Sequence, residues 1–226
     1  MRRSWRKLRR RLFRAIAIVA AALALWVVAY RWIDPPATYL IAAEWIRLGH
    51  VEREWRDLDE ISPHLARAAM GGEDAWFCDH YGFDIDAIRA AIAETDRRRG
   101  ASTISQQVAK NAFLWPDSNW ARKGLEVGFT ALIEMSWPKA RIMEVYLNIA
   151  EMGPGVFGAE AAARHWFGVS AADLSLAQAA RIAAILPNPR ERSASSPSGF
   201  VQRRARAIAA GADTLRAEGR AACLER

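Results

Sequence analysis

Residues 100–111 read GASTISQQVAKN, and the middle of this stretch predicts the start of a helix. Thr103 is followed three positions later by Gln106, which is the spacing of a capping box, where each side chain binds the backbone N–H of the other residue. On the helix that follows, Gln106, Gln107 and Lys110 share one face, because residues three and four apart are neighbours on a helix surface. A solvated helix face and a polar binding surface both explain this pattern.

Similar start signals recur along the chain and predict a mainly α protein. Ser and Asn favour the position before a helix, and Pro favours its first turn. Helices are expected after Ser62-Pro63, after Asp84 (with Ile85, Ile88 and Ile92 on one face), after Asn119 to about Ser136, after Ser175 with Gln178 as a second capping box, and over 200–217. Another helix is expected with Pro138 in its first turn and an apolar stripe of Ile142, Val145, Tyr146 and Ile149. No strand with period-2 alternation and no internal repeat is visible. We expect one helical domain over about 34–226.

Composition and charge narrow the class of protein. The chain has 226 residues, of which 52% are hydrophobic and 25% charged, and this excludes a disordered or low-complexity protein. Residues 1–14 contain eight basic side chains and no acidic one. The formal net charge of the whole chain is +7, so residues 15–226 together carry a net charge of −1. The basic excess is a property of the N-terminus, and we expect no nucleic-acid partner. The pairing of the two cysteines, Cys78 and Cys223, is left open.

The N-terminus predicts a cytoplasmic basic tail followed by a membrane anchor, together covering residues 1–33. Residues 15–30 (AIAIVAAALALWVVAY) carry no charge, and apolar residues extend the stretch to about 12–33. About 22 residues form a helix of roughly 33 Å, enough to cross a bilayer. Basic residues that flank a span stay in the cytoplasm, so the rest of the chain is expected on the outer side. A cleaved signal peptide is the rival interpretation, although its apolar core is usually shorter.

Two short motif matches are rejected on their context. Residues 153–158 (GPGVFG) satisfy the dinucleotide-binding pattern, but a helical stripe and not a strand precedes them. Residues 136–139 (SWPK) satisfy a penicillin-binding pattern, but no K-T-G follows and too little chain remains for such a domain. The four histidines are scattered without metal-ligand spacing, so no protein-held metal site is predicted.

Two further segments carry chemistry. Residues 73–84 (EDAWFCDHYGFD) place carboxylates and one imidazole among aromatic rings, where a carboxyl group can have a raised pKa and act as an acid or base. Residues 122–126 (RKGLE) place two cations on the helix face of Glu126. Helix capping, surface charge and ordinary helix ion pairs are the alternative interpretations.

Together these segments resemble glycosyltransferase family 51, the peptidoglycan glycosyltransferases. The patterns are Glu-Asp-x-x-Phe-x-x-His-x-Gly-Phe-Asp at 73–84, Gly-x-Ser-Thr-Ile-x-Gln-Gln-x-x-Lys-Asn at 100–111 and Arg-Lys-x-x-Glu at 122–126, continued by 141–148, 153–158, 161–168 and 174–189. Each pattern is weak alone, whereas the ordered set over about 55–190 is specific. The chain is similar to the monofunctional type, an anchor with one glycosyltransferase domain. Gln178 stands where the family often has Glu.

The resemblance implies a lysozyme-like helical fold, anchored in the inner membrane with its N-terminus cytoplasmic and its domain periplasmic. It implies that the growing glycan strand is transferred from undecaprenyl pyrophosphate to the GlcNAc 4-hydroxyl of lipid II, with inversion, in cell wall biogenesis. Lipid II, the glycan strand and the membrane are then the partners, and other cell-wall synthesis proteins are left open. No cofactor is required, while a divalent cation, Mg²⁺ or Mn²⁺, at the pyrophosphate is left open.

The resemblance also assigns roles to residues. Glu73 is implied as the base on the attacking hydroxyl, and Glu126 as an aid to the leaving group. The cations implied at the pyrophosphate are Lys110, Arg122 and Lys123. The residues implied along the sugar cleft are Ser102, Thr103, Gln106, Gln107 and Asn111. The residues expected to shape the segment 73–84, here called the first motif, rather than react are Asp74, Phe77 and His80.

Two other classes of function are weighed. A lysozyme-like hydrolase or lytic transglycosylase also has a helical fold and one Glu, but it needs neither cations at a leaving group nor an anchor. Release of reducing ends from finished sacculi would favour it. A membrane-anchored scaffold would keep the fold and lose the carboxylates, and both Glu73 and Glu126 are present.

Overall fold

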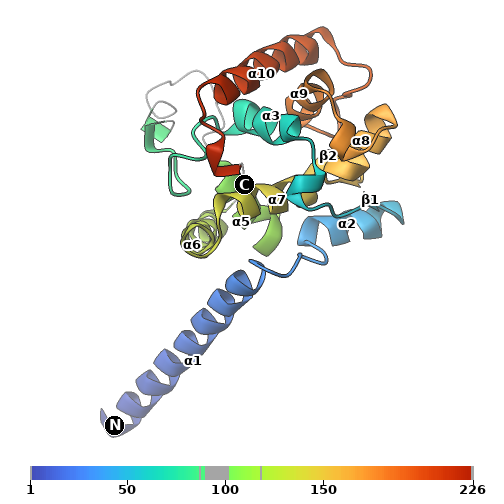
Figure 1. The fold of residues 1–226 in the computed structure, drawn as a ribbon. Coiled ribbons are helices and arrows are strands. Elements are labelled where there is room, and N and C mark those ends of the chain that lie inside the picture. The colour runs from blue at the N-terminus through green and yellow to red at the C-terminus, as the bar shows by residue number, and fades with distance from the viewer. Residues whose placement is uncertain (1, 87, 90–101, 118, 225–226) are drawn as a thin grey trace.

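The computed structural model describes residues 2–86, 88–89, 102–117 and 119–224, and Figure 1 shows their arrangement. The helices are α1 (Arg2–Ala29), α2 (Tyr39–Leu48), α3 (Pro63–Glu73), α5 (Ile104–Phe113), α6 (Trp120–Ser136), α7 (Lys139–Ile149), α8 (Ala159–Phe167), α9 (Leu176–Ile185) and α10 (Gly199–Ala217). Short 3-10 helices are η1 (Leu58–Glu60), η2 (Ala171–Asp173) and η3 (Ala222–Leu224). The predicted mainly α, lysozyme-like class is confirmed.

Helix α1 projects away from the other helices (Figure 1). Its segment Trp5–Ala29 is long and apolar enough to cross a membrane, and little of it is buried against the protein. The helix differs from the predicted span of 12–33, because the basic residues are already helical from Arg2 and the helix ends at Ala29. Beyond that end, the Arg141 guanidinium donates to the carbonyl oxygens of Tyr30 (3.0 Å) and Ile33 (3.1 Å), so α7 holds the exit from the span.

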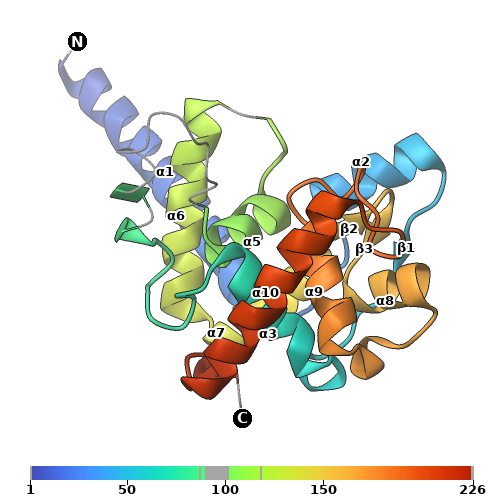
Figure 2. The same ribbon diagram turned by 90° about the horizontal axis from the view of Figure 1, so that it is seen from above.

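The remaining helices form two lobes. Helices α3, α9 and α10 pack against one another in the first lobe, and α5 packs against α6 in the second, where α1 also contacts α6 (Figure 2). Every residue from Ala140 to Ile149 on α7 is buried. The sequence predicted only one apolar stripe on this segment, whereas a helix buried on all sides belongs to the core. Figure 2 shows α7 near the meeting point of the two lobes.

A small sheet lies beside α2 and α8, which corrects the expectation that strands are lacking. Strands β1 (Glu52–Arg53), β3 (Val156–Phe157) and β2 (Glu151–Gly153) pair in that order, β1 parallel and β2 antiparallel to β3. Strands of two or three residues carry no detectable alternation. The GPGVFG segment spans the end of β2, the turn and β3, so a short strand precedes this turn, contrary to the helix expected there. The two strands form an antiparallel pair, whereas a dinucleotide-binding turn lies between a parallel strand and a helix. Gly158 has φ +87°, and a Cβ there would lie 2.9 Å from the Asn148 carbonyl oxygen.

Most predicted helix starts are found. Capping boxes form at Thr103 with Gln106 and at Ser175 with Gln178, and Asn119 caps α6 through the Arg122 N–H. Ser62 precedes α3 as predicted, but its hydroxyl donates to the Leu174 carbonyl (2.8 Å) instead of capping the helix. Pro138 is the residue before α7 rather than part of its first turn. Of the stripe expected after Asp84, Ile92 lies outside the described residues.

Candidate active site

Glu73 is the last residue of α3 and points its carboxylate toward α5 and α10. Its Oε2 accepts a hydrogen bond from Gln107 Nε2 at 3.1 Å, and its Oε1 accepts one from Arg204 Nη2 at 3.2 Å. Burial raises the pKa of Glu73 above its ordinary value, while the Gln107 hydrogen bond and the charges of Arg204 and Lys110 oppose this rise. The side chain keeps 15% exposure. Glu73 is therefore a partly desolvated carboxylate, fixed in orientation yet still accessible.

Arg204 is a site residue that the sequence analysis missed. It lies on α10, 131 residues after Glu73, and its Nη2 also donates to the Gly72 carbonyl at 3.1 Å. The packing of α10 against α3 brings it there. Because 28 of the 32 basic residues are arginines and several stand on this helix, no local signal singles it out.

Glu126 on α6 is buried between two cations. Arg122 Nη1 donates to Oε2 at 2.7 Å, and Lys123 Nζ pairs with Oε1. The predicted grouping on one helix face is found. Both carboxylate oxygens are thus taken by cations, and the described part of the chain holds no group of three or more His, Cys, Asp or Glu side chains that could bind a metal. This donor set does not fit a divalent cation held by the protein alone.

Lys110 on α5 is half-buried and interacts with both glutamates. Burial lowers the pKa of Lys110, the charges of Glu126 and Glu73 oppose this, and the neighbouring cations Arg122 and Lys123 add to it. Its ammonium group makes no hydrogen bond or ion pair with any residue in the described ranges. A pocket of about 90 Å³ is lined by Lys110, Asn111, Leu40, Leu114, Trp115 and Pro116. The site therefore contains a cation that lacks a fixed counter-ion among the described residues.

Asp74 connects the first motif to α5. Its Oδ2 accepts the backbone N–H of Ile104 at 2.9 Å, and its Oδ1 pairs with His80 Nε2 at 2.8 Å. His80 Nδ1 accepts the Gly82 N–H at 3.1 Å, so the ring proton is on Nε2 and is donated to Asp74. Phe77 is fully buried. These side chains shape the loop after Glu73, which agrees with their expected part in the first motif.

The residues predicted along the sugar cleft differ in their surroundings. Gln107 reaches Glu73, Asn111 lines the pocket beside Lys110, and Ser102 is exposed. Thr103 and Gln106 are buried in their capping box, and the Thr103 hydroxyl also donates to the Gly82 carbonyl at 2.7 Å. In this structure these two side chains position the start of α5, and their part in a sugar cleft stays a prediction.

Tyr146 on α7 is a second residue near the site, and the sequence placed it only in an apolar stripe of its helix. Burial raises its pKa well above the usual value, and the charges of Glu73 and Asp74 add to the rise. Its hydroxyl oxygen is buried without a hydrogen-bond partner in the described part of the structure. A neutral phenol therefore lies behind the two carboxylates.

The sequence of this chain is similar to one protein-family model and to several known proteins. Residues 42–212 match the family model described as Transglycosylase. The chain is 54% identical over 216 residues to the "Biosynthetic peptidoglycan transglycosylase" of Jannaschia sp. (strain CCS1), covering 96% of this chain and 90% of the relative. It is 52% identical over 225 residues to the protein of the same name from Rhodospirillum centenum (strain ATCC 51521 / SW), covering 95% and 96%. A third protein of that name, from Ectopseudomonas mendocina (strain ymp), is 50% identical over 209 residues.

Proposed function

The chain belongs to the transglycosylase family, and on that premise we propose that it polymerises the glycan strands of peptidoglycan from lipid II. The growing strand on undecaprenyl pyrophosphate is the donor, and the 4-hydroxyl of the acceptor GlcNAc attacks its C1 carbon. The bond from C1 to the pyrophosphate oxygen breaks as the new bond forms, and the configuration at C1 inverts from α to β. The similarity to proteins named biosynthetic peptidoglycan transglycosylase supports the peptidoglycan part of this proposal.

Glu73 is the base in this proposal. A hydroxyl becomes a better nucleophile when a positioned carboxylate accepts its proton in the transition state. The raised pKa of Glu73 makes it a stronger base than an exposed carboxylate. Hydrogen bonds from Gln107 and Arg204 fix its orientation and leave lone pairs for the incoming proton. The proton taken from the acceptor hydroxyl then leaves to solvent.

The observation that carries the proposal is the state of Lys110. A half-buried ammonium without a hydrogen bond or ion pair to the described residues is costly unless an anion binds it. With Arg122 and Lys123 it brings three positive charges near Glu126, and the one other carboxylate that acts on Lys110 among the described residues is that of Glu73. Such a cluster suits a pyrophosphate, on which negative charge develops as the C1–O bond breaks. Glu126 holds its two cations in place by charge-assisted hydrogen bonds.

The reaction is proposed to proceed without a metal ion held by the protein, because both carboxylate oxygens of Glu126 are paired with cations. A Mg²⁺ or Mn²⁺ ion carried in by the pyrophosphate itself stays a prediction, and added chelator would test it.

The proposed location is the inner membrane, with the N-terminus in the cytoplasm and the domain in the periplasm. The basic residues before the apolar part of α1 support this orientation through the positive-inside rule. A disulfide between Cys78 and Cys223 supports it independently, because such bonds persist in oxidising compartments. A membrane anchor confines the enzyme to the surface that carries its lipid-linked substrate, and this raises the effective concentration of enzyme and substrate for each other.

The test is incubation of the purified full chain, in detergent, with labelled lipid II. The proposal predicts long glycan polymers that lysozyme digests. The rival function, a lytic transglycosylase or hydrolase, would instead release soluble fragments from finished sacculi. Fragment release without any polymer would refute the proposal.

A further inference from the structure

We infer that residues 219–224, here named the C-terminal strap, position the loop that follows Glu73, and that the Cys78–Cys223 disulfide fixes the strap to that loop. The inference rests on the proposed function for its catalytic consequence. The sequence left the pairing of these cysteines open, and nothing in the reaction itself requires a bond between them.

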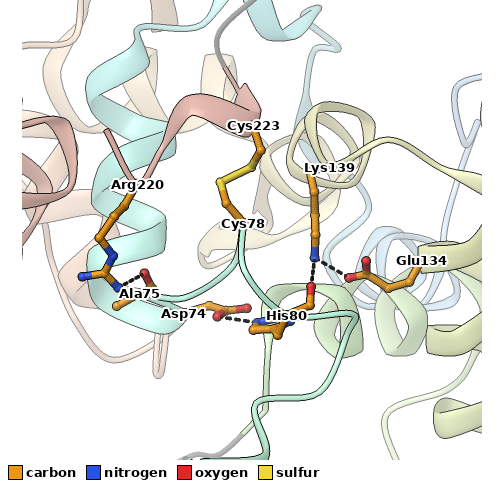
Figure 3. The surroundings of a disulfide bond; sticks show 8 residues. All are labelled: Asp74, Ala75, Cys78, His80, Glu134, Lys139, Arg220 and Cys223. Carbon is orange, nitrogen blue, oxygen red and sulfur yellow. Dashed lines mark hydrogen bonds and ion pairs between the residues drawn. A yellow bond between two sulfur atoms is a disulfide. The ribbon is translucent and has the colours of Figure 1, made fainter. Parts of the chain in front are cut away.

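Three contacts join the strap to three loop residues, Ala75, Trp76 and Cys78, and Figure 3 shows those to Ala75 and Cys78. Cys223 forms a disulfide with Cys78 across 145 residues of chain. Arg220 Nη2 donates to the Ala75 carbonyl at 2.8 Å. The Arg220 guanidinium carbon also lies 3.5 Å from the centre of the Trp76 ring, within cation–π distance. The strap thus holds the loop by a covalent bond, a hydrogen bond and a ring contact.

The second lobe holds the other part of the same loop. Lys139 Nζ donates to the His80 carbonyl at 2.7 Å and pairs with Glu134 at 2.8 Å (Figure 3). The same ammonium lies 4.5 Å from the centre of the Phe77 ring. Loss of the strap would therefore remove the contacts to Ala75, Trp76 and Cys78, while Lys139 still holds Phe77 and His80.

Such a release would act on the base itself. Glu73 and Asp74 directly precede the strapped residues, and Asp74 accepts the first N–H of α5. Helix α5 carries Gln107, one hydrogen-bond donor to Glu73. Arg204, the other donor, lies on α10, the helix that leads into the strap. The strap is therefore connected to both groups that orient Glu73, and a misplacement of about 1 Å can cost up to about 10²-fold in rate.

The experiment compares the oxidised chain, the chain reduced with dithiothreitol and the double variant Cys78→Ser/Cys223→Ser. Reduction converts the S–S bond to two thiols and the reductant to its cyclic disulfide. Two quantities are measured: amide hydrogen exchange of peptides covering 74–84, and kcat and KM for lipid II polymerisation. We expect faster exchange, a fall in kcat of about tenfold, within the bound above, and a KM within about threefold, because Arg122 and Lys123 on α6 do not touch the strap.

Two controls make the result decisive. The double variant should have the low kcat without reductant and should not respond to it, which excludes other effects of dithiothreitol. Leu174→Ala removes a buried side chain outside the strap and the loop, and it serves as a destabilised control whose melting temperature is measured beside that of the reduced chain. Unchanged exchange, unchanged kcat, or an equal fall in kcat for Leu174→Ala would overturn the inference. If the oxidised chain makes no polymer, the proposed function fails, and hydrogen exchange alone then decides whether the strap holds the loop.

Discussion

Replacement of Arg204 by Gln tests whether its charge sets the basicity of Glu73. The two charged groups lie 3.2 Å apart. Unit charges at that distance interact by about 1.3 kcal/mol in water and by about 5 kcal/mol at an effective dielectric constant near 20. The Arg204 side chain is 31% exposed and that of Glu73 15%, so solvent screens the pair and the lower figure applies. About 1.3 kcal/mol is roughly tenfold in the balance between protonated and ionised Glu73.

The positive charge of Arg204 determines the direction in which its loss changes the pKa of Glu73. Without Arg204 the ionised form of Glu73 loses a favourable interaction, so its pKa, already raised by burial, rises further. The acidic limb of the kcat/KM profile should then move to higher pH, and the rate at pH values below that limb should fall by up to roughly tenfold. At pH values above the limb the variant should approach the rate of the unmodified chain.

Initial polymerisation rates on labelled lipid II, measured from about pH 5 to pH 9, give this profile. Arg204→Lys is the matched control, because it keeps the charge and loses only the guanidinium geometry. Its limb should lie close to that of the unmodified chain. A uniform loss of rate at every pH for Arg204→Gln would show that Arg204 acts on packing and not on the titration of Glu73.

Three further predictions concern other parts of the molecule. Lys110→Gln should lower the polymerisation rate on lipid II by about 10², the lower end for loss of one group that stabilises developing charge, and a loss under threefold would contradict its role. Asp74→Ala leaves the Ile104 N–H and the His80 Nε2–H without acceptors, so the free energy of unfolding should fall by about 1–3 kcal/mol for each group, and a melting curve unchanged within error would refute this. A phosphatase fused after residue 226 should be active in a Gram-negative host, whereas an inactive phosphatase with an active cytoplasmic reporter at the same site would reverse the proposed orientation.

The sequence predicts local structure correctly where residues a few positions apart along the chain determine it. The capping boxes at 103–106 and 175–178 depend on residues three positions apart and were predicted correctly. Ser62 was assigned a cap by the same rule, yet its hydroxyl bonds to Leu174, 112 residues away. The short strands were missed for a similar reason, since residues of β1 pair with β3 across about a hundred residues.

In the candidate site, too, contacts between residues close in sequence were predicted, and contacts between distant residues were not. The grouping of Arg122, Lys123 and Glu126 follows from helix spacing and was predicted. The proximity of Glu73 to Lys110 was implied only by the family resemblance, because two lobes must pack before these groups interact. Arg204 and the disulfide partner of Cys78 belong to the C-terminal part of the chain, where composition offers many arginines and no local pattern.

The central claim is that Glu73 accepts the proton of the attacking hydroxyl, and the polymerisation rate of Glu73→Gln tests it most directly. The amide keeps the size of the side chain and removes the base. Asp79→Asn, at an exposed position in the same loop, is the matched control and should keep the rate within about twofold. Folded Glu73→Gln should lose about 10²–10⁴-fold in rate on labelled lipid II. A folded Glu73→Gln that keeps more than about a tenth of the rate would show that Glu73 is not the base.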